Sequence, residues 1–209
     1  KFTLGEALTN PRVLGLALVY FGIVTGLYGF GIWAPQIIKA FGLTIAQTGW
    51  VAAIPFLAGA LVMVPWTHHS DRTRERVWHV ALPAFLGGFG LIVGSYMGNP
   101  YIAMLFLTLG SVGTFAALPT FWTLPTALLT GTAAAGGIAL INAIGNVGGF
   151  VGPYLVGWIK DNALAMKIVA DQAGANALSI TVIGGFMIAA GLLTLALGHD
   201  PALEEGAHK

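Results

Sequence analysis

The stretch that decides the fold is residues 77–159, which read VWHVALPAFLGGFGLIVGSYMGNPYIAMLFLTLGSVGTFAALPTFWTLPTALLTGTAAAGGIALINAIGNVGGFVGPYLVGWI. None of its 83 residues is Asp, Glu, Lys or Arg, whereas about a quarter of the residues in an average soluble domain are charged. A helix that crosses a bilayer needs about 20 consecutive, mostly apolar residues. The stretch therefore has room for three such helices, and its continuous apolar character excludes the alternating pattern of a membrane β-barrel.

Three further runs without charge extend this pattern towards both ends of the chain. Residues 13–38, 40–70 and 172–199 contain no Asp, Glu, Lys or Arg, and each run has room for one helix across the bilayer. Charged residues make up only 8% of the 209 residues, so a soluble, secreted or disordered chain is excluded. We predict an all-α integral membrane protein whose six transmembrane helices form one domain over residues 1–209. The predicted spans are 13–38, 46–67, 78–97, 101–128, 133–159 and 178–197.

The rest of the composition narrows the possible functions. Without cysteine the chain has no disulfide and no zinc–thiolate site, and its formal net charge of +1 gives no footprint for nucleic acid. His68, His69 and Asp71 do not predict a metal site, because adjacent histidines point apart and no further ligand completes the set. We expect no metal and no cofactor. The start, KFTLGE at residues 1–6, has neither Met nor a signal-peptide pattern and reads as an internal linker.

Lysine and arginine residues in the connections predict how the helices lie in the membrane. An even number of spans places both termini on one side, which carries six of the nine basic residues, and the side rich in basic residues faces the cytoplasm. We therefore expect a multi-pass protein of the inner (plasma) membrane, with both termini and the tail 198–209 in the cytoplasm. The six are Lys1, Arg12, Arg72, Arg74, Arg76 and Lys209, and the three on the other side are Lys39, Lys160 and Lys167.

The connection between the second and third spans, HHSDRTRER at residues 68–76, contains three arginines. We expect a short polar loop in which Asp71 caps the following turn and holds an arginine. Two interpretations of this loop stay open. Asp71, Arg72 and Arg76 form a conformational latch, or the arginines are a plain anchor on the cytoplasmic side.

Two prolines, Pro119 and Pro125, lie inside the fourth span. Each proline removes a backbone hydrogen bond and frees carbonyl groups. Within a membrane, such freed groups are tolerated only where protein or a wet cavity satisfies them. We therefore expect this part of the span to adjoin protein or a wet cavity.

The fifth span carries a polar stripe. Asn142, Asn146, Gly149 and Pro153 follow at offsets of 0, 4, 7 and 11 residues, which at about 100° per residue place them on one side of a helix. The asparagines either face a polar cavity or bond to another helix, and both roles satisfy a buried amide. Small residues beside the stripe predict close packing against a neighbouring helix; these are Gly145, Gly149 and Gly152.

The first span carries two tyrosines, Tyr20 and Tyr28, about 80° apart around the helix. They share a broad face, and each hydroxyl needs a partner, which is either a group inside the bundle or a ligand. No Asp, Glu, Lys or Arg lies within the core of any predicted span, and such residues usually mark proton relays. The chain by itself therefore cannot run proton coupling through a carboxylate.

Several of these segments together are similar to one known family. Residues 66–76 (WTHHSDRTRER) resemble the second-half copy of the cytoplasmic loop motif of the major facilitator superfamily. Residues 121–125 (FWTLP), 131–139 (GTAAAGGIA) and 141–153 (INAIGNVGGFVGP) are similar to its anion:cation symporter family, the carriers of organic acids such as tartrate, galactonate, glucarate and phthalate. The resemblance covers the whole chain, as helices seven to twelve of a twelve-helix carrier. It implies that the first six helices, which this sequence does not contain, hold the substrate arginine and the proton-coupling acid.

The resemblance implies secondary transport of small organic anions (sugar acids, dicarboxylates or aromatic acids) by proton symport with alternating access, and no enzyme activity. The implied partners are the organic anion, protons, the N-terminal six-helix half and the lipid bilayer. The implied substrate-binding residues are Trp122, Asn142, Tyr20, Tyr28 and Asn146.

Other functions were weighed against this one. A self-contained six-helix channel of the aquaporin type needs two Asn-Pro-Ala motifs, but the chain has only Asn-Pro-Arg at 10–12 and Asn-Pro-Tyr at 99–101, both at span ends. An intramembrane serine protease would use Ser111, but every histidine lies at a span end or in a connection, so no base is positioned. A different six-helix channel and a membrane scaffold fragment without transport remain the alternatives.

Overall fold

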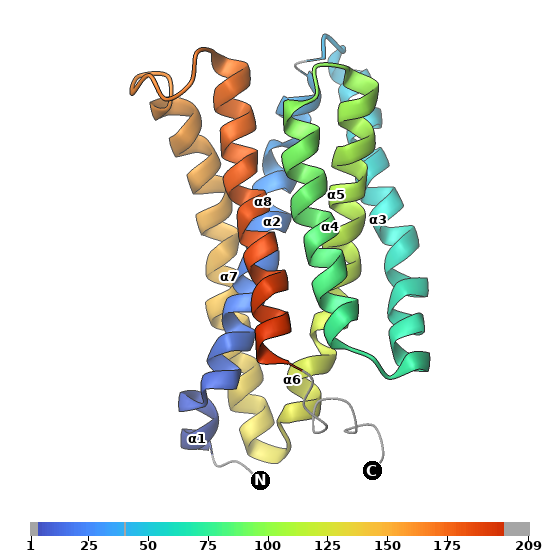
Figure 1. Ribbon diagram of the computed structural model, residues 1–209, viewed down its shortest axis with the longest axis vertical. Helices are drawn as coiled ribbons and strands as arrows, with labels where there is room; N and C mark the ends of the chain where they lie inside the picture. The colour runs from blue at the N-terminus through green and yellow to red at the C-terminus, as the bar shows by residue number, and fades with distance from the viewer. Residues whose placement is uncertain (1–3, 40, 199–209) are drawn as a thin grey trace.

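The computed structural model describes residues 4–39 and 41–198, and within them the chain is helical, with no strand (Figure 1). The predicted all-α fold is therefore confirmed. The helices are α1 (Leu4–Thr9), α2 (Pro11–Lys39), α3 (Ile45–Thr73), α4 (Val77–Tyr96), α5 (Pro100–Phe121), α6 (Thr123–Leu128), α7 (Gly131–Asn162) and α8 (Gln172–Leu197).

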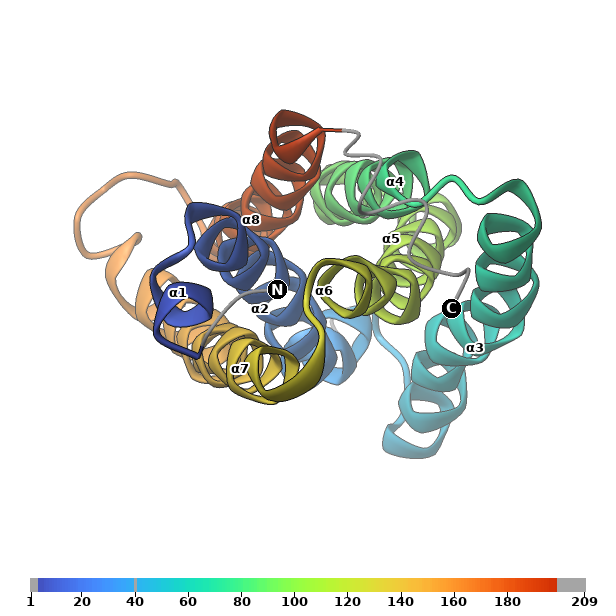
Figure 2. The ribbon, with the colours of Figure 1, turned by 90° about the horizontal axis from the view of Figure 1, so that it is seen from below.

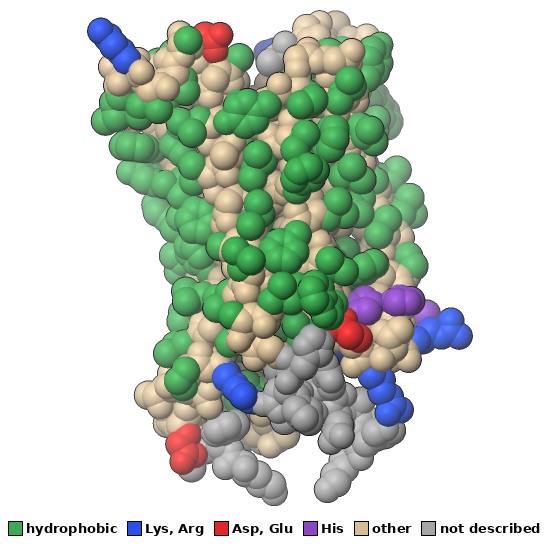
Figure 3. All heavy atoms as spheres, in the orientation of Figure 1, with side chains coloured by type: hydrophobic (Ala, Val, Ile, Leu, Met, Phe, Trp, Pro, Cys, Tyr) green, Lys and Arg blue, Asp and Glu red, His purple; other side chains and the backbone are tan. Residues whose placement is uncertain are grey.

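Six segments of the described residues are long and apolar enough to cross a membrane. They are α2, α3, α4, α5 together with α6, α7 and α8. Hydrophobic side chains cover the middle of the molecule, whereas charged side chains gather towards its two ends (Figure 3). The tail expected in the cytoplasm lies, from residue 199 onward, outside the described residues.

Local sequence signals fix where several helices begin. Thr44 and Gln47 form a reciprocal capping box at the start of α3, in which each side chain bonds to the backbone N–H of the other residue. Asn99 accepts hydrogen bonds from two backbone N–H groups of α5, and Pro100 follows it at the first helical position, where no N–H is needed. Asp171 caps α8 through the N–H of Gly174 at 2.8 Å.

The six long helices pack in two interleaved groups of three. The first long helix, α2, packs against α7 and α8, whereas α3 and α4 pack against α5. The contact between α4 and α8 joins the two groups (Figure 2). Each group thus takes one helix from one half of the chain and two helices from the other half.

Glycines allow the closest of these contacts. A Cβ atom added to Gly90 on α4 would lie 2.5 Å from the backbone nitrogen of Gly110 on α5. On the other side of α4, a Cβ added to Gly88 would lie 2.5 Å from the carbonyl oxygen of Gly184 on α8. Inside a bilayer, helices associate largely through such close backbone packing, because lipid tails are as apolar as the side chains. The 30 glycines of the chain are therefore compatible with long helices.

Candidate functional site

The fourth predicted span, residues 101–128, is a broken helix, in line with the backbone bonds that its prolines were expected to remove. α5 ends at Phe121, α6 begins at Thr123, and Trp122 lies at the break between them. Pro125 supplies no N–H for the carbonyl of Phe121, four residues earlier, which explains the break. Threonine hydroxyls around the break bond to nearby carbonyl groups: Thr123 to Thr120 at 2.7 Å and Thr126 to Trp122 at 2.9 Å.

The ring of Tyr20 contacts the two aromatic residues at the helix break. Its ring stacks on Phe121 with the centroids 5.2 Å apart, and Trp122 meets it edge-on with the centroids 4.7 Å apart. Only 8% of Tyr20 is exposed, whereas Trp122 is half-buried. Of these two predicted site residues, Tyr20 therefore supports the site from within the bundle, and Trp122 presents part of its ring at the surface.

The three glycines of α7 that were predicted to pack against another helix face α2. A Cβ atom at Gly145 would collide with the ring of Tyr20, and one at Gly152 would lie 2.5 Å from the carbonyl oxygen of Thr25. A Cβ at Gly149 would meet the ring of Tyr28 at 3.3 Å, a looser contact. Gly145 and Gly152 therefore lie where the two helices approach most closely, and Gly149 lies at the edge of that contact.

Asn142 and Asn146 lie on the exposed side of α7. The amide of Asn146 donates to the side-chain oxygen of Asn142 at 2.7 Å and to its backbone carbonyl at 2.8 Å. Within the described residues, the amide nitrogen of Asn142 and the side-chain oxygen of Asn146 have no protein partner. The two residues therefore form one polar unit with unused hydrogen-bonding capacity, about 16 to 22 Å along α7 from its first residue, Gly131.

The five predicted binding residues lie on α2, α7 and the α5–α6 break, and contacts of Tyr20 link these three elements. Tyr20 contacts both Trp122 and Gly145, and Gly145 directly precedes Asn146 in α7. Tyr28 is 45% exposed and lies beside Gly149, one turn further along α7. We call Trp122, Tyr28, Asn142 and Asn146, with Tyr20 behind them, the polar face.

The connection between α3 and α4 differs from the loop expected over residues 68–76. α3 continues as a helix to Thr73 and ends at Arg74, whose φ of 56° is left-handed. The hydroxyl of Thr73 bonds to the carbonyl of His69 at 2.9 Å within this last turn. The predicted loop is therefore wrong for residues 68–73, because polar residues at the end of a span can continue its helix beyond the apolar core.

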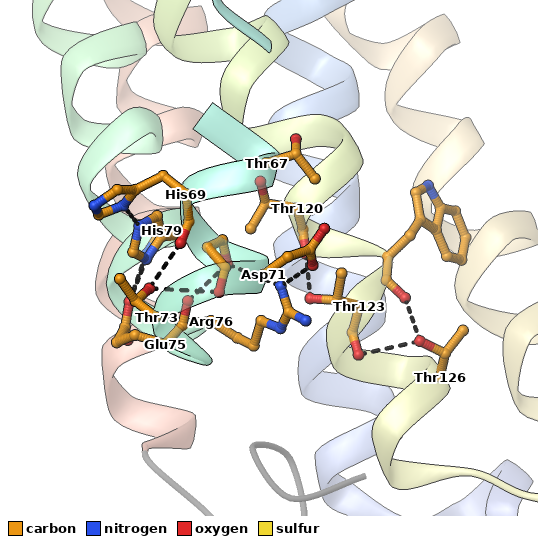
Figure 4. Close-up of polar contacts among 12 residues, drawn as sticks. Thr67, His69, Asp71, Thr73, Glu75, Arg76, His79, Thr120, Thr123 and Thr126 are labelled. Carbon is orange, nitrogen blue, oxygen red and sulfur yellow. Dashed lines mark hydrogen bonds and ion pairs between the residues drawn. The ribbon is translucent and has the colours of Figure 1, made fainter. Parts of the chain in front are cut away.

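Asp71 does not cap the next helix, as was expected, because it lies in the last turn of α3. It instead holds Arg76, whose guanidinium lies 2.5 Å from the carboxylate of Asp71 and 3.1 Å from the hydroxyl of Ser70 (Figure 4). Ser70 in turn donates to the carbonyl of Glu75 at 2.6 Å. Arg72 is exposed and makes no hydrogen bond or ion pair to the part of the chain that the structure describes.

Glu75 caps α4, a role that the sequence analysis missed. Its carboxylate accepts hydrogen bonds from the backbone N–H groups of Trp78 at 2.7 Å and His79 at 3.1 Å. Burial raises the pKa of Glu75, but these bonds and the contact with the His79 ring outweigh it and hold the pKa below its ordinary value. The signal was present, because a carboxylate next to the first turn of a helix is favoured there.

Comparison with known proteins gives one family and several curated relatives. Residues 1–153 match the family described as the Major Facilitator Superfamily. Over 190 residues the chain is 43% identical to a "Putative tartrate transporter" of Agrobacterium vitis, which covers 91% of this chain and 42% of that protein. It is 35% identical over 184 residues to a "Quinolone resistance transporter" of Acinetobacter baumannii, with coverage of 88% and 41%.

A third relative is the "Inner membrane transport protein RhmT" of Escherichia coli (strain K12). The identity is 34% over 207 residues, which is 98% of this chain and 46% of that protein. The chain thus spans less than half the length of each of these three relatives.

Proposed function

This chain belongs to the major facilitator superfamily, and from that premise we propose that it is the C-terminal half of a secondary transporter for small organic anions. Sugar acids, dicarboxylates and aromatic acids are the proposed substrates, and proton symport with alternating access is the proposed mechanism. In carriers of this kind the substrate lies near the middle of the bilayer, between two repeats that move against each other. The names of relatives such as the tartrate transporter support the substrate class.

The polar face is the observation that carries the proposal. Asn142 and Asn146 are exposed within a span that is otherwise apolar, and an amide that faces hydrocarbon without a partner is costly. A polar cavity with a bound anion removes this free-energy cost, because amide N–H groups donate to carboxylate oxygens. Trp122 at the α5–α6 break and Tyr28 on α2 offer rings against which the carbon skeleton of an organic acid can pack.

The apolar surface of α3 and α7 supports a second half as the partner of this chain. Only 22% of the most apolar stretch of each helix is buried, against 67% for α2, and the two helices lie at opposite ends of the bundle with α2 and α6 between them (Figure 2). The exposed apolar residues of α3 repeat at intervals of four and three, the period of a seam between two helices. They are Trp50, Ile54, Leu57, Leu61 and Val64.

The proposed orientation places the α3–α4 connection in the cytoplasm, in the inner (plasma) membrane. α1 and the end of α8 lie at the same end of the molecule as that connection (Figure 1), in line with an even number of spans. Arg12 and the three arginines of the connection belong to this end, whereas Lys39, Lys160 and Lys167 belong to the other. Because no carboxylate lies within the core of a span of this chain, we place the proton-coupling acid in the other half.

Uptake of radiolabelled tartrate by the full-length protein in proteoliposomes tests the proposal. We expect saturable uptake that an inward proton gradient accelerates and that a protonophore reduces to the level without a gradient. Competition by unlabelled glucarate and phthalate then orders the substrate classes. Absence of saturable uptake of all three acids would contradict the substrate class, and uptake without any response to the gradient would contradict proton symport.

A further inference from the structure

Three ionisable side chains form a hydrogen-bonded row between α3 and α4. His69 Nδ1 lies 2.7 Å from His79 Nε2, and His79 Nδ1 lies 2.6 Å from a carboxylate oxygen of Glu75 (Figure 4). Trp66 fixes the same turn, because its indole N–H donates to the carbonyl of His79 at 2.9 Å. His69 is exposed, whereas His79 is buried with 8% of its surface exposed. The row therefore leads from solvent at His69 to a mostly buried carboxylate.

The chemistry of the row assigns its hydrogens. An ionised carboxylate only accepts hydrogen bonds, so His79 Nδ1 carries a hydrogen and donates it to Glu75. In a neutral imidazole the other ring nitrogen then accepts, so His79 Nε2 accepts a hydrogen from His69 Nδ1. The Nε2 atom of His69 is left without a hydrogen and can receive a proton.

One added proton can be taken up without breaking either bond. The proton binds to His69 Nε2, the hydrogen on His69 Nδ1 passes to His79 Nε2, and His79 becomes an imidazolium that donates from both nitrogens. His69 stays neutral and has only changed tautomer. A second proton on the rings would place two N–H donors opposite each other over 2.7 Å, so the bond between the rings limits the two histidines to one added proton.

The position of Glu75 favours this protonation. Before the proton binds, the row carries the single negative charge of Glu75, and afterwards it is neutral as a whole. Because His79 is mostly buried, its positive charge needs a paired partner, and the carboxylate 2.6 Å away supplies one.

Among the described residues, few other charges surround the row. Asp71 is paired with Arg76, and α5 and α8, which pack against α4, contain no Asp, Glu, Lys, Arg or His. The other charged or titratable side chains at this end of the described helices are Glu6, Arg12, His68, Arg72 and Arg74.

We propose that His69, His79 and Glu75 form a proton-binding site that takes up one proton through His69 and holds it on His79, against Glu75. Binding makes the neutral hydrogen bond between His69 on α3 and His79 on α4 a charge-assisted one, in which the His79 imidazolium donates, and charge-assisted bonds are roughly twice as strong as neutral ones. The site therefore tightens the junction of α3 and α4 as the pH falls. This goes beyond the proposed transport and does not depend on it.

The test is the nitrogen NMR spectrum of the full-length protein, labelled with ¹⁵N-histidine and held in lipid nanodiscs. The pH is varied from about 5 to 8, the range in which imidazoles titrate. We expect His79 Nε2 to change from a bare nitrogen to an N–H at the same midpoint at which His69 Nδ1 changes from an N–H to a bare nitrogen. His79 Nδ1 should keep its hydrogen throughout. Separate midpoints for the two rings, or an imidazolium at His69, would overturn the proposal.

Variants separate the site from the histidines around it. In His79→Gln, the midpoint of His69 should move, because interacting sites titrate together. His68→Gln is the matched control: His68 is the exposed neighbour of His69 and makes no hydrogen bond within the described residues, so both midpoints should stay unchanged. If His79→Gln does not fold, His69→Gln replaces it, since His69 is exposed, and the midpoint of His79 should then move. Midpoints that stay in place in the variant that folds would contradict the shared proton.

Discussion

The side chain of Asn146 donates to the side-chain oxygen of Asn142 at 2.7 Å, across one turn of α7. The pair leaves a donor on Asn142 and an acceptor on Asn146 pointing away from the rest of the described chain. Whatever covers this face must therefore offer both kinds of partner, or the pair must lie beside water.

Asn142→Ala should weaken transport without removing the protein from the membrane. A lost neutral hydrogen bond is worth roughly 0.5–1.5 kcal/mol, so we expect the KM for tartrate to rise about 2- to 10-fold in the full-length protein. Asn146→Ala should raise the KM by a similar factor. In the double variant, the loss of binding free energy should be smaller than the sum of the two single losses, because the two amides act as a pair. Val147→Ala, one position further along α7, is the control. Unchanged kinetics in both asparagine variants would remove them from the site.

Gly152→Ala should destabilise the bundle. Its new methyl group would lie 2.5 Å from the carbonyl oxygen of Thr25 on α2, so the helices must move apart, at a cost of about 1–3 kcal/mol. Gly185→Ala is a matched control on α8, because no atom lies within 4 Å of the added carbon and alanine is the better helix former. Thermal unfolding in detergent should give a lower Tm for Gly152→Ala and an unchanged or higher Tm for Gly185→Ala. Equal Tm values would contradict the packing role of the α2–α7 contact.

Asp71→Asn distinguishes a conformational latch from a plain anchor. The substitution removes the ion pair with Arg76, whose side chain is only 15% exposed, and a latch of this kind should then change the rate of uptake while the amount of protein in the membrane stays the same. Arg72→Lys should leave the rate unchanged, since Arg72 has no bond within the described residues. The rate of uptake per amount of protein in the membrane distinguishes the latch from the anchor. Normal rates in both variants would favour the anchor.

Glu75 makes stability depend on pH at the acidic end of the range. Hydrogen bonds in the folded chain hold its pKa below the ordinary value, so the unfolded chain binds the proton more tightly. This contribution to stability is complete above the unfolded glutamate pKa of about 4.3 and is lost as the pH falls through the folded pKa. The difference in Tm between the wild-type protein and Glu75→Gln should therefore shrink below about pH 4. A constant difference for Glu75→Gln would contradict the cap.

Residues 1–209 expressed alone should not transport. The polar face and the apolar stripe of α3 would both meet lipid, and the polar face has unused donors and acceptors that lipid tails cannot satisfy. Co-expression with the separate N-terminal half should restore uptake of labelled tartrate. Saturable, proton-dependent uptake by residues 1–209 alone would instead indicate a complete six-helix transporter.

The charge-free runs predicted the helices well, because the length and polarity of a bilayer constrain sequence directly. They did not predict where helices end. α3 continues to Thr73, since a helix can extend beyond the apolar core into water, and α5 ends at Phe121, where a proline four residues later removes a bond. Neither boundary is a change in hydropathy, so a pattern based on apolar runs alone misses both.

The candidate site was predictable where it depends on one helix and unpredictable where it depends on two. The spacing of Asn142 and Asn146 in sequence already placed them on one side of α7. The position of Tyr20 between Gly145 and Trp122 depends on how α2 crosses α7 and meets the α5–α6 break. The bond between His69 and His79 likewise depends on a turn that brings two residues ten positions apart face to face, and no spacing rule indicated it.

The interleaved packing of the helices also sets an order of assembly during synthesis. Among the long helices of the described residues, α2 is made first, but its main partners, α7 and α8, begin about 90 and 130 residues after it ends. At about 5–20 residues per second, α2 waits roughly 5–20 seconds for α7. During that interval Gly22, Gly26 and Gly29, whose contacts lie with α8, lack the helix against which they pack. A ribosome that stalls before α8 therefore leaves a nascent chain that cannot close this six-helix bundle, which makes the synthesis of α8 the step that completes it.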